Sequence, residues 1–158
     1  MINVLFVCMG NICRSPSGEA VFKALVKSLG LEDKFYIDSA GTIGYHEGEP
    51  ADSRMQKHAA KRGIQLTSRS RPIKNSDFEK FDYIVAMDRN NYKNINSMDK
   101  NGLYSNKIIM MTDFSKKHYG EDVPDPYYGG SDGFELVLDL IQESSEGLLE
   151  EIRRQHEF

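Results

Sequence analysis

The sequence from residue 2 to residue 16 reads INVLFVCMGNICRSP. Its first part, Ile2 to Val7, is a short apolar run rich in β-branched residues, which is typical of a strand buried on both faces of a parallel sheet. Its last part, Ser15-Pro16, opens a helix, because proline is tolerated in the first helical turn, where its missing N–H would have no partner. The segment Cys8 to Arg14 is therefore a loop that connects a buried strand to a helix.

Further strands and helices alternate along the rest of the chain. We predict strands at residues 35–39, 81–87 and 107–111, and helices at residues 51–62, directly after Asp88, and from about residue 134 onward. This alternation favours an α/β fold with a doubly wound, four-stranded parallel sheet and helices on both faces, in a single domain over residues 1–158. Ligands of such folds bind beyond the carboxyl ends of the strands, where the loop after Cys8 begins.

The composition is that of an ordinary soluble globular protein, with 39% hydrophobic and 28% charged residues. No apolar run approaches the roughly 20 residues of a membrane span, and no basic segment precedes the first strand, so we expect neither a membrane partner nor a signal peptide. The two cysteines, Cys8 and Cys13, are too close together to staple a domain, which favours a reducing, cytoplasmic location. A net charge of −4 without a basic tail argues against a nucleic-acid partner.

The charges are unevenly distributed. Residues 54–74 carry seven Lys or Arg and no acid, whereas residues 121–151 carry ten Asp or Glu and no Lys or Arg. Two interpretations are open: the segments form solvated faces of opposite sign, or the basic segment steers an anionic substrate.

The loop after the first strand has the pattern of an anion site, with five residues between Cys8 and Arg14. Between a strand and a helix, successive backbone N–H groups of such a loop can point at one centre, where the helix dipole adds positive potential. Arg14 adds a planar fork that matches two phosphate oxygens, and the same field stabilises a thiolate at Cys8. The predicted phosphate-binding residues are Met9, Gly10, Asn11, Ile12, Cys13 and Arg14.

Other interpretations of this loop are weaker. Cys8 could be a buried residue at a strand end and Arg14 a surface residue of the helix, but the strand before the loop and the helix after it favour the anion site. The loop lacks the Gly-Lys-Ser/Thr ending of a nucleotide-binding loop. We expect no metal site, because the four histidines are scattered and neither cysteine has a Cys-x2-Cys partner.

Attack by Cys8 on a phosphate ester requires an acid for the leaving group, and Asp125 is the best candidate. A tyrosyl oxygen leaves as a phenolate whose conjugate acid has a pKa of ~10, and a placed acid is typically worth ~10²–10⁴ in rate. Pro124 and Pro126 flank the aspartate and stiffen its loop. Asp125 could also be an ordinary turn residue between prolines, but a phosphate loop with a nucleophile favours the catalytic role.

Residues 4–16 and the segment Asp125-Pro-Tyr-Tyr-Gly resemble the low-molecular-weight protein tyrosine phosphatases. The resemblance continues through residues 38–42, 81–84 and 87–88, and so covers nearly the whole chain. It implies hydrolysis of phosphotyrosine in proteins through a phosphocysteine, without a cofactor and with Asp125 acting first as acid and then as base. It also implies phosphate or other oxyanions as ligands of the site. We expect a monomer or a weak dimer.

Further roles follow from the resemblance. Asn11 would hold the loop in a strained shape with Ser39 hydrogen-bonded behind it, and Ser15 would assist the departing thiolate. Ser15 is equally a helix cap, and Ser39 equally a turn residue at a strand end. Cys13 would form a reversible disulfide with Cys8 that shields the nucleophile from overoxidation, or it is only a small packing residue.

The substrate cleft implied by the resemblance has aromatic walls. Tyr45, Tyr127 and Tyr128 would stack on the phosphotyrosine ring beside Ile12, although ordinary half-buried aromatics are an alternative, above all for Tyr128. In some relatives the paired tyrosines are themselves phosphorylated. Ser68 departs from the family, because it stands where many animal members have a histidine that supports the phosphate loop.

Three other functions are compatible with a loop of this kind. Arsenate reductases of the same fold need further cysteines after Cys13, and the chain has none. Protein-arginine phosphatases resemble the loop more closely but carry a threonine in place of Ile12, and a bulky apolar residue there disfavours a phosphoguanidinium. A catalytically silent phosphate-binding module is disfavoured by the presence of both Cys8 and Asp125.

Overall fold

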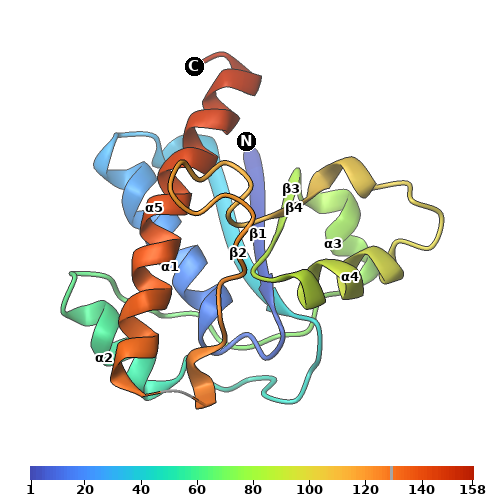
Figure 1. The fold of residues 1–158 in the computed structure, drawn as a ribbon. Helices are drawn as coiled ribbons and strands as arrows, with labels where there is room; N and C mark the ends of the chain where they lie inside the picture. Colours follow the sequence, from blue (N-terminus) through green and yellow to red (C-terminus); the bar gives the residue numbers. More distant parts are fainter. Residues whose placement is uncertain (129) are drawn as a thin grey trace.

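Four parallel strands form one sheet at the centre of the computed structural model, which describes residues 1–128 and 130–158 but not the side chains of Tyr128 and Ser131. The strands are β1 (Ile2–Cys8), β2 (Phe35–Gly41), β3 (Tyr83–Ala86) and β4 (Ile108–Met110), in the order β2-β1-β3-β4 (Figure 1). The chain thus moves outward from β1 first to one side and then to the other, which confirms the predicted doubly wound parallel sheet.

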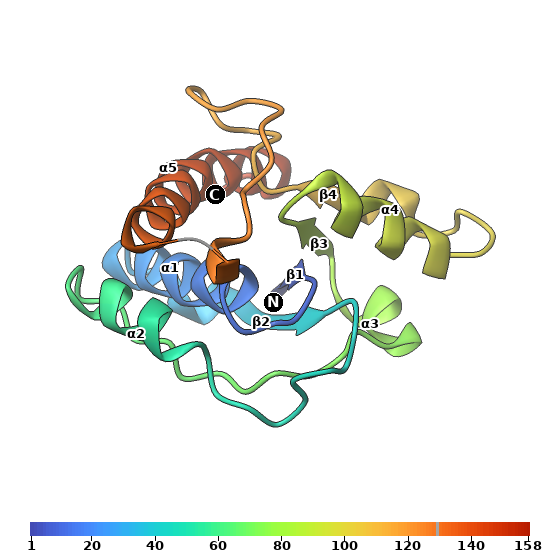
Figure 2. The same ribbon diagram turned by 60° about the horizontal axis from the view of Figure 1, so that its bottom comes forward.

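The helices cover both faces of the sheet, as predicted. They are α1 (Arg14–Ser28), α2 (Ser53–Ala60), α3 (Asn75–Lys80), α4 (Arg89–Met98) and α5 (Ser131–His156), with short 3-10 turns at Glu32–Lys34, Ser105–Lys107 and Pro126–Tyr128. Figure 2 shows α1 and α5 on one side of the sheet and α3 and α4 on the other. Within the described part of the chain, no helix is both long enough and apolar enough to cross a membrane.

The central strand β1 is buried on both faces because its alternate side chains enter two separate cores. Val4 and Phe6 pack with residues of α1 and α5, and the Phe6 ring lies 5.7 Å from that of Phe22 between centroids. Leu5 and Val7 enter the second core, beneath α3 and α4. This double burial explains why the segment is a continuous apolar run rather than an alternating one.

Two details of the predicted helices were wrong or missed. The sequence predicts Val21, Leu25 and Leu29, with Phe22 alongside, as the apolar stripe of α1. The buried apolar side chains include Val21, Phe22 and Val26, Leu25 is partly buried, and Leu29 is 51% exposed. Leu29 is the C-cap residue, so it lies where the helix has ended. The short helix α3 was not predicted, since six residues give too little periodicity to recognise.

The carboxyl ends of the strands meet at one edge of the molecule. In Figure 1 the loop after β1, the segment after β2 and the segment before α5 all lie at the bottom of the view. Gly18 brings α1 close to β1, because a Cβ at that position would lie 2.9 Å from the Phe6 ring. The start of α1, and with it the loop after Cys8, is therefore fixed against the sheet.

Candidate active site

The loop from Cys8 to Cys13 turns its backbone carbonyl groups outward, and five of them accept hydrogen bonds from segments around or after it. These pairs are Cys8 O with Thr42 N (2.9 Å), Met9 O with Ile43 N (3.1 Å), Gly10 O with Ser70 Oγ (3.0 Å), Ile12 O with Asp52 N (2.8 Å) and Cys13 O with Ser17 N (3.2 Å). Gly41 allows the close approach of β2, because a Cβ there would lie 2.7 Å from the Met9 carbonyl oxygen.

The outward carbonyls determine where the amide groups point. In a trans peptide the N–H of one residue points away from the carbonyl of the residue before it, and none of the peptides among the described residues is cis. The N–H groups of residues 9–11, 13 and 14 therefore point toward the inside of the loop. Since α1 begins at Arg14, its dipole adds positive potential at the same point. The loop is thus a cradle of donors suited to an oxyanion.

Cys8 lies at the base of this cradle and is 3% exposed. Its Sγ is 3.3 Å from Asn11 N, 3.4 Å from Ser15 N and 3.0 Å from Ser15 Oγ. Two amide donors and a hydroxyl thus converge on the sulfur.

A buried chain of hydrogen bonds orients the Ser15 hydroxyl. Asn11 Nδ2 donates to Ser15 Oγ (2.7 Å) and to Ser39 Oγ (3.0 Å), and Ser39 in turn donates to Glu19 Oε1 (2.6 Å). Because Ser15 Oγ accepts from Asn11, its single hydrogen is left for Cys8 Sγ or for the Ala40 carbonyl at 3.3 Å. The shorter contact to sulfur suits a hydroxyl that donates to a thiolate.

Asn11 adopts a left-handed backbone conformation with φ of 56°, one of two such non-glycine residues among those described. Its side-chain oxygen accepts the Arg71 N–H (3.0 Å), so all three of its side-chain hydrogen bonds are buried or partly buried. The predicted grouping of Asn11 with Ser15 and Ser39 is thus present in space. Glu19, which ends this chain of hydrogen bonds, was not foreseen.

The hydrogen bonds that hold Arg14 in place use one nitrogen of its guanidinium, Nη1. Its Nη1 donates to Asp88 Oδ2 (2.5 Å) and to the Val123 carbonyl (3.0 Å). Asp88 also caps α4, because its Oδ1 accepts the Asn91 N–H. Sequence reasoning missed the contact between Asp88 and Arg14, because the two residues are 74 positions apart.

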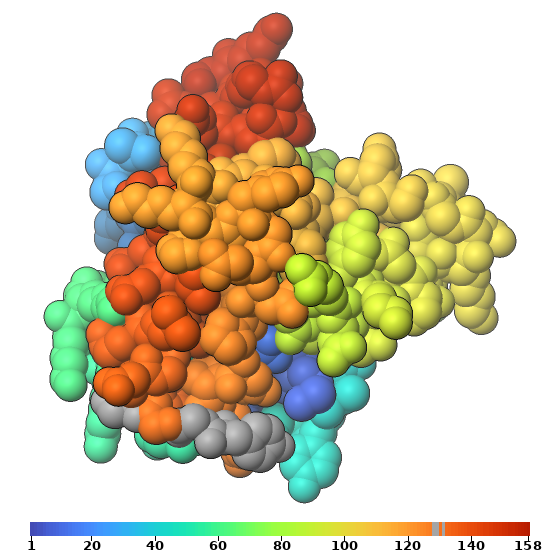
Figure 3. Space-filling model, viewed as in Figure 1, coloured from blue at the N-terminus to red at the C-terminus, as the bar shows by residue number. Residues whose placement is uncertain are grey.

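Asp125 faces Arg14 across the pocket. Its Oδ2 is 3.7 Å from Arg14 Nη2, and its Oδ1 accepts the Tyr127 N–H (3.0 Å). The Asp125 side chain is 31% exposed, so it borders both the pocket and solvent. The pocket is lined by Cys8, Met9, Gly10, Ile12, Cys13, Arg14, His46, Asp125 and Tyr127. In Figure 3 a small blue area of the N-terminal segment is visible between the orange segment that precedes α5, the start of α4 and the cyan loop after β2.

The predicted cleft residues lie at different depths. Ile12 and Tyr127 line the pocket, and Tyr127 is 39% exposed. Tyr45 is 82% exposed and packs its ring edge-to-face on His46 at 5.0 Å, outside the pocket lining. The Tyr128 side chain lies outside the described residues. His46 also lines the pocket. The family resemblance places it in the loop that sets specificity, but no preference was derived for it from the sequence.

Ser70, rather than Ser68, supports the loop from behind. Ser70 is 4% exposed and its hydroxyl donates to the Gly10 carbonyl, whereas Ser68 is half-buried and makes no hydrogen bond to the described residues. Arg71, the residue after Ser70, donates its backbone N–H to Asn11 Oδ1, and its side chain forms ion pairs with Asp38 and Asp77.

Cys13 and Cys8 are both free, buried thiols that line the same pocket. Burial raises the pKa of Cys13 strongly, and the Asp52 carboxylate raises it further. Cys13 is therefore a neutral thiol next to the predicted nucleophile.

Three of the seven basic residues in segment 54–74 form ion pairs, among them Arg54 with Asp52. Arg62 pairs with Glu135 and Asp139 of α5, and Arg71 lies between Asp38 and Asp77. The other four basic residues, Lys57, Lys61, Arg69 and Lys74, are exposed and form no ion pair with the described residues. None of the seven lines the pocket, which favours a solvated face over steering of the substrate.

Comparison with known proteins places these features in a family. The family model described as low molecular weight phosphotyrosine protein phosphatase matches residues 3–157. A putative low molecular weight protein-tyrosine-phosphatase of Synechocystis is 45% identical over 148 residues, with 94% of each chain covered. A crystal structure of a protein tyrosine phosphatase from Entamoeba histolytica, with Hepes in the active site, superposes with a TM-score of 0.94 at 46% identity and covers 99% of each chain. A Drosophila arginine phosphatase superposes with a TM-score of 0.87 at 35% identity, covering 95% of this chain and 97% of its own.

Proposed function

The chain belongs to the low molecular weight phosphotyrosine protein phosphatases and is a protein tyrosine phosphatase; we propose that it acts through a phosphocysteine on Cys8, with Arg14 as phosphate ligand and Asp125 as general acid and base. The observation that carries this division of roles is the loop itself. Its carbonyls are bound outward, its amides converge inward, and the Cys8 sulfur lies at their centre beneath Arg14 and Asp125.

In the first step the substrate phosphate enters the cradle and its oxygens accept hydrogen bonds from the loop amides and from Arg14. The Cys8 thiolate attacks phosphorus, so that a P–S bond forms as the P–O bond to the tyrosyl oxygen breaks. Asp125 transfers its proton to that oxygen, and tyrosine leaves as the neutral phenol.

In the second step Asp125, now a carboxylate, takes a proton from a water molecule that attacks the phosphocysteine. The new P–O bond forms, the P–S bond breaks, and inorganic phosphate is released. The departing sulfur becomes a thiolate again, and the Ser15 hydroxyl, 3.0 Å from Cys8 Sγ, donates to it.

The test uses two variants and two substrates. Cys8→Ser is expected to abolish hydrolysis of 4-nitrophenyl phosphate while still binding vanadate, and turnover that survives it would refute the nucleophile. Asp125→Asn is expected to lower kcat/KM for phenyl phosphate, whose leaving group has a pKa of ~10, far more than for 4-nitrophenyl phosphate. Binding without any turnover by the unaltered protein would instead support a silent phosphate-binding module.

Arginine phosphatase activity is the second candidate, since a solved arginine phosphatase shares the fold. Ile12 lines the pocket and offers no side-chain acceptor to a guanidinium, which favours the flat phenyl ring of phosphotyrosine. Parallel kinetics on phosphotyrosine and phosphoarginine peptides decide between the two, and faster turnover of phosphoarginine would reverse our choice.

We also propose redox control through a Cys8–Cys13 disulfide, in a reducing compartment such as the cytoplasm. Cys8 and Cys13 line one pocket, and Cys13 is a neutral thiol able to react with a sulfenic acid formed on Cys8 by peroxide, with loss of water. Peroxide treatment should inactivate the protein reversibly, with recovery by dithiothreitol, and Cys13→Ser should make inactivation irreversible.

A further inference from the structure

Arg54, in the first turn of α2, connects three parts of the site. Its Nη2 donates to the Tyr127 carbonyl at 3.2 Å, directly after the segment that carries Asp125. Its guanidinium lies 5.4 Å from the centre of the Tyr127 ring and 5.0 Å from that of Phe134, at the start of α5. Arg54 is not among the described residues that line the pocket, so it lies outside the phosphate site.

Asp52 fixes the orientation of Arg54. Asp52 Oδ2 accepts from Arg54 Nη2 (2.9 Å) and Oδ1 accepts from Arg54 Nε (3.2 Å), a bidentate pair that holds the guanidinium plane. Burial raises the pKa of Asp52, but the hydrogen bonds from Arg54 outweigh this and lower it, so the pair is ionised at neutral pH.

Asp52 also joins this pair to the phosphate loop. Its backbone N–H donates to the Ile12 carbonyl (2.8 Å), and its side chain caps α2 through the amides of Arg54 and Met55. A continuous path of contacts therefore runs from Ile12 through Asp52 and Arg54 to the Tyr127 carbonyl.

We propose that Arg54 is a positioning residue for the general acid: it holds the turn after Asp125 at a fixed place relative to the phosphate loop. This inference rests on the proposed role of Asp125. The Asp125 carboxylate accepts the Tyr127 N–H at 3.0 Å, so its direction depends on where the Tyr127 residue lies. Arg54 fixes that residue by both its carbonyl and its ring.

The expected effect is on proton transfer and not on phosphate binding. Loss of Arg54 leaves the loop amides and Arg14 in place, so competitive inhibition by inorganic phosphate should change little. Misplacement of the acid should slow the release of poor leaving groups, as a partial loss of the ~10²–10⁴ that a placed acid contributes.

The experiment measures kcat/KM for phenyl phosphate and for 4-nitrophenyl phosphate in Arg54→Gln, Arg54→Lys and Asp125→Asn, since kcat/KM covers the step in which the phenol leaves. We expect Arg54→Gln to lower kcat/KM about tenfold for phenyl phosphate and less than about threefold for 4-nitrophenyl phosphate. Arg54→Lys should fall between Arg54→Gln and the unaltered protein, because an ammonium can restore one hydrogen bond but not the planar stack. In the Asp125→Asn background, Arg54→Gln should have no further selective effect.

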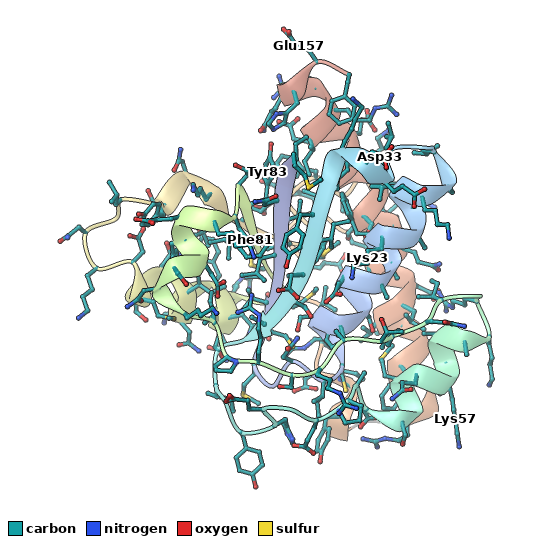
Figure 4. The ribbon with its side chains drawn as sticks, turned by 180° about the vertical axis from the view of Figure 1, so that it is seen from behind. Lys23, Asp33, Lys57, Phe81, Tyr83 and Glu157 are labelled. Carbon is teal, nitrogen blue, oxygen red and sulfur yellow. The ribbon has the colours of Figure 1, made fainter. Side chains whose placement is uncertain are left out.

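Lys57→Gln is the matched control, because Lys57 is an exposed cation of the same helix and points away from the rest of the molecule (Figure 4). Lys57→Gln should leave kcat/KM unchanged for both substrates. Arg54 does not position the acid if Arg54→Gln lowers kcat/KM equally for both substrates. The same conclusion follows if Arg54→Gln still lowers kcat/KM more for phenyl phosphate than for 4-nitrophenyl phosphate in the Asp125→Asn background. If Asp125→Asn itself shows no selectivity, the proposed general acid fails and the inference fails with it.

Discussion

Removal of the Ser70 hydroxyl should destabilise the phosphate loop without touching any group that binds phosphate. Ser70→Ala breaks one hydrogen bond of 3.0 Å to the Gly10 carbonyl. A hydrogen bond of this kind contributes about 0.5–1.5 kcal/mol, and an acceptor left buried and unpaired costs about 1–3 kcal/mol. Gly10 is half-buried, so water can replace part of the loss, and we expect a decrease of about 1 kcal/mol in the free energy of unfolding.

The same change should weaken oxyanion binding. Without the Ser70 hydroxyl, the peptide between Gly10 and Asn11 is free to rotate, and the Asn11 N–H, now 3.3 Å from Cys8 Sγ, loses its fixed direction. If phosphate binding must fix this peptide again at a cost of ~1 kcal/mol, the inhibition constant of inorganic phosphate rises by about fivefold.

Urea unfolding and phosphate inhibition measure the two effects, and Ser68→Ala is the matched control. Ser68 lies two residues away and makes no hydrogen bond to the described residues, so its loss should change stability by less than about 0.5 kcal/mol. A larger effect of Ser68→Ala than of Ser70→Ala on either quantity would refute the assignment of loop support to Ser70.

Three further predictions concern the interior. Iodoacetamide at neutral pH should modify Cys8 and spare Cys13, whose pKa is raised by burial, as peptide mapping by mass spectrometry would reveal. Asn11→Asp should lower both the melting temperature and kcat/KM, because a carboxylate cannot donate the two hydrogen bonds of the amide and adds a buried charge. Gly147→Ala should lower the free energy of unfolding in urea by about 1–3 kcal/mol or more, because the new Cβ would lie 2.0 Å from the backbone oxygen of Phe114.

The central part of the fold was predictable because its signals are contiguous. The apolar run of β1, the loop after Cys8 and the proline in the first turn of α1 all lie within residues 2–16. Alternation of strands and helices then leaves few topologies, since crossovers between parallel strands are right-handed. The short helix α3 escaped because it is held by contacts such as the burial of Phe78 in the core and not by a pattern of its own.

The supports of the site were not predictable, because they join segments that are distant in the sequence. Ser70 reaches Gly10 across 60 positions, and Asp88 reaches Arg14 across 74. A serine or an aspartate in a loop carries no local sign of such a partner, and each is equally a turn or cap residue. The family resemblance directed attention to Ser68, whereas the serine of this segment that binds the loop is Ser70.

The general acid illustrates how local and distant constraints combine. Pro124 and Pro126 restrict the backbone on either side of Asp125, which was the basis of its prediction. Stiffness alone does not place a carboxylate, because a rigid segment can still move as a body. Two arginines provide the missing anchors: Arg14 donates to the Val123 carbonyl before the aspartate, and Arg54 donates to the Tyr127 carbonyl after it. Arg14 also belongs to the phosphate cradle, so the anchor before the aspartate is shared with the phosphate site, whereas the anchor after it, Arg54, lies outside the pocket lining.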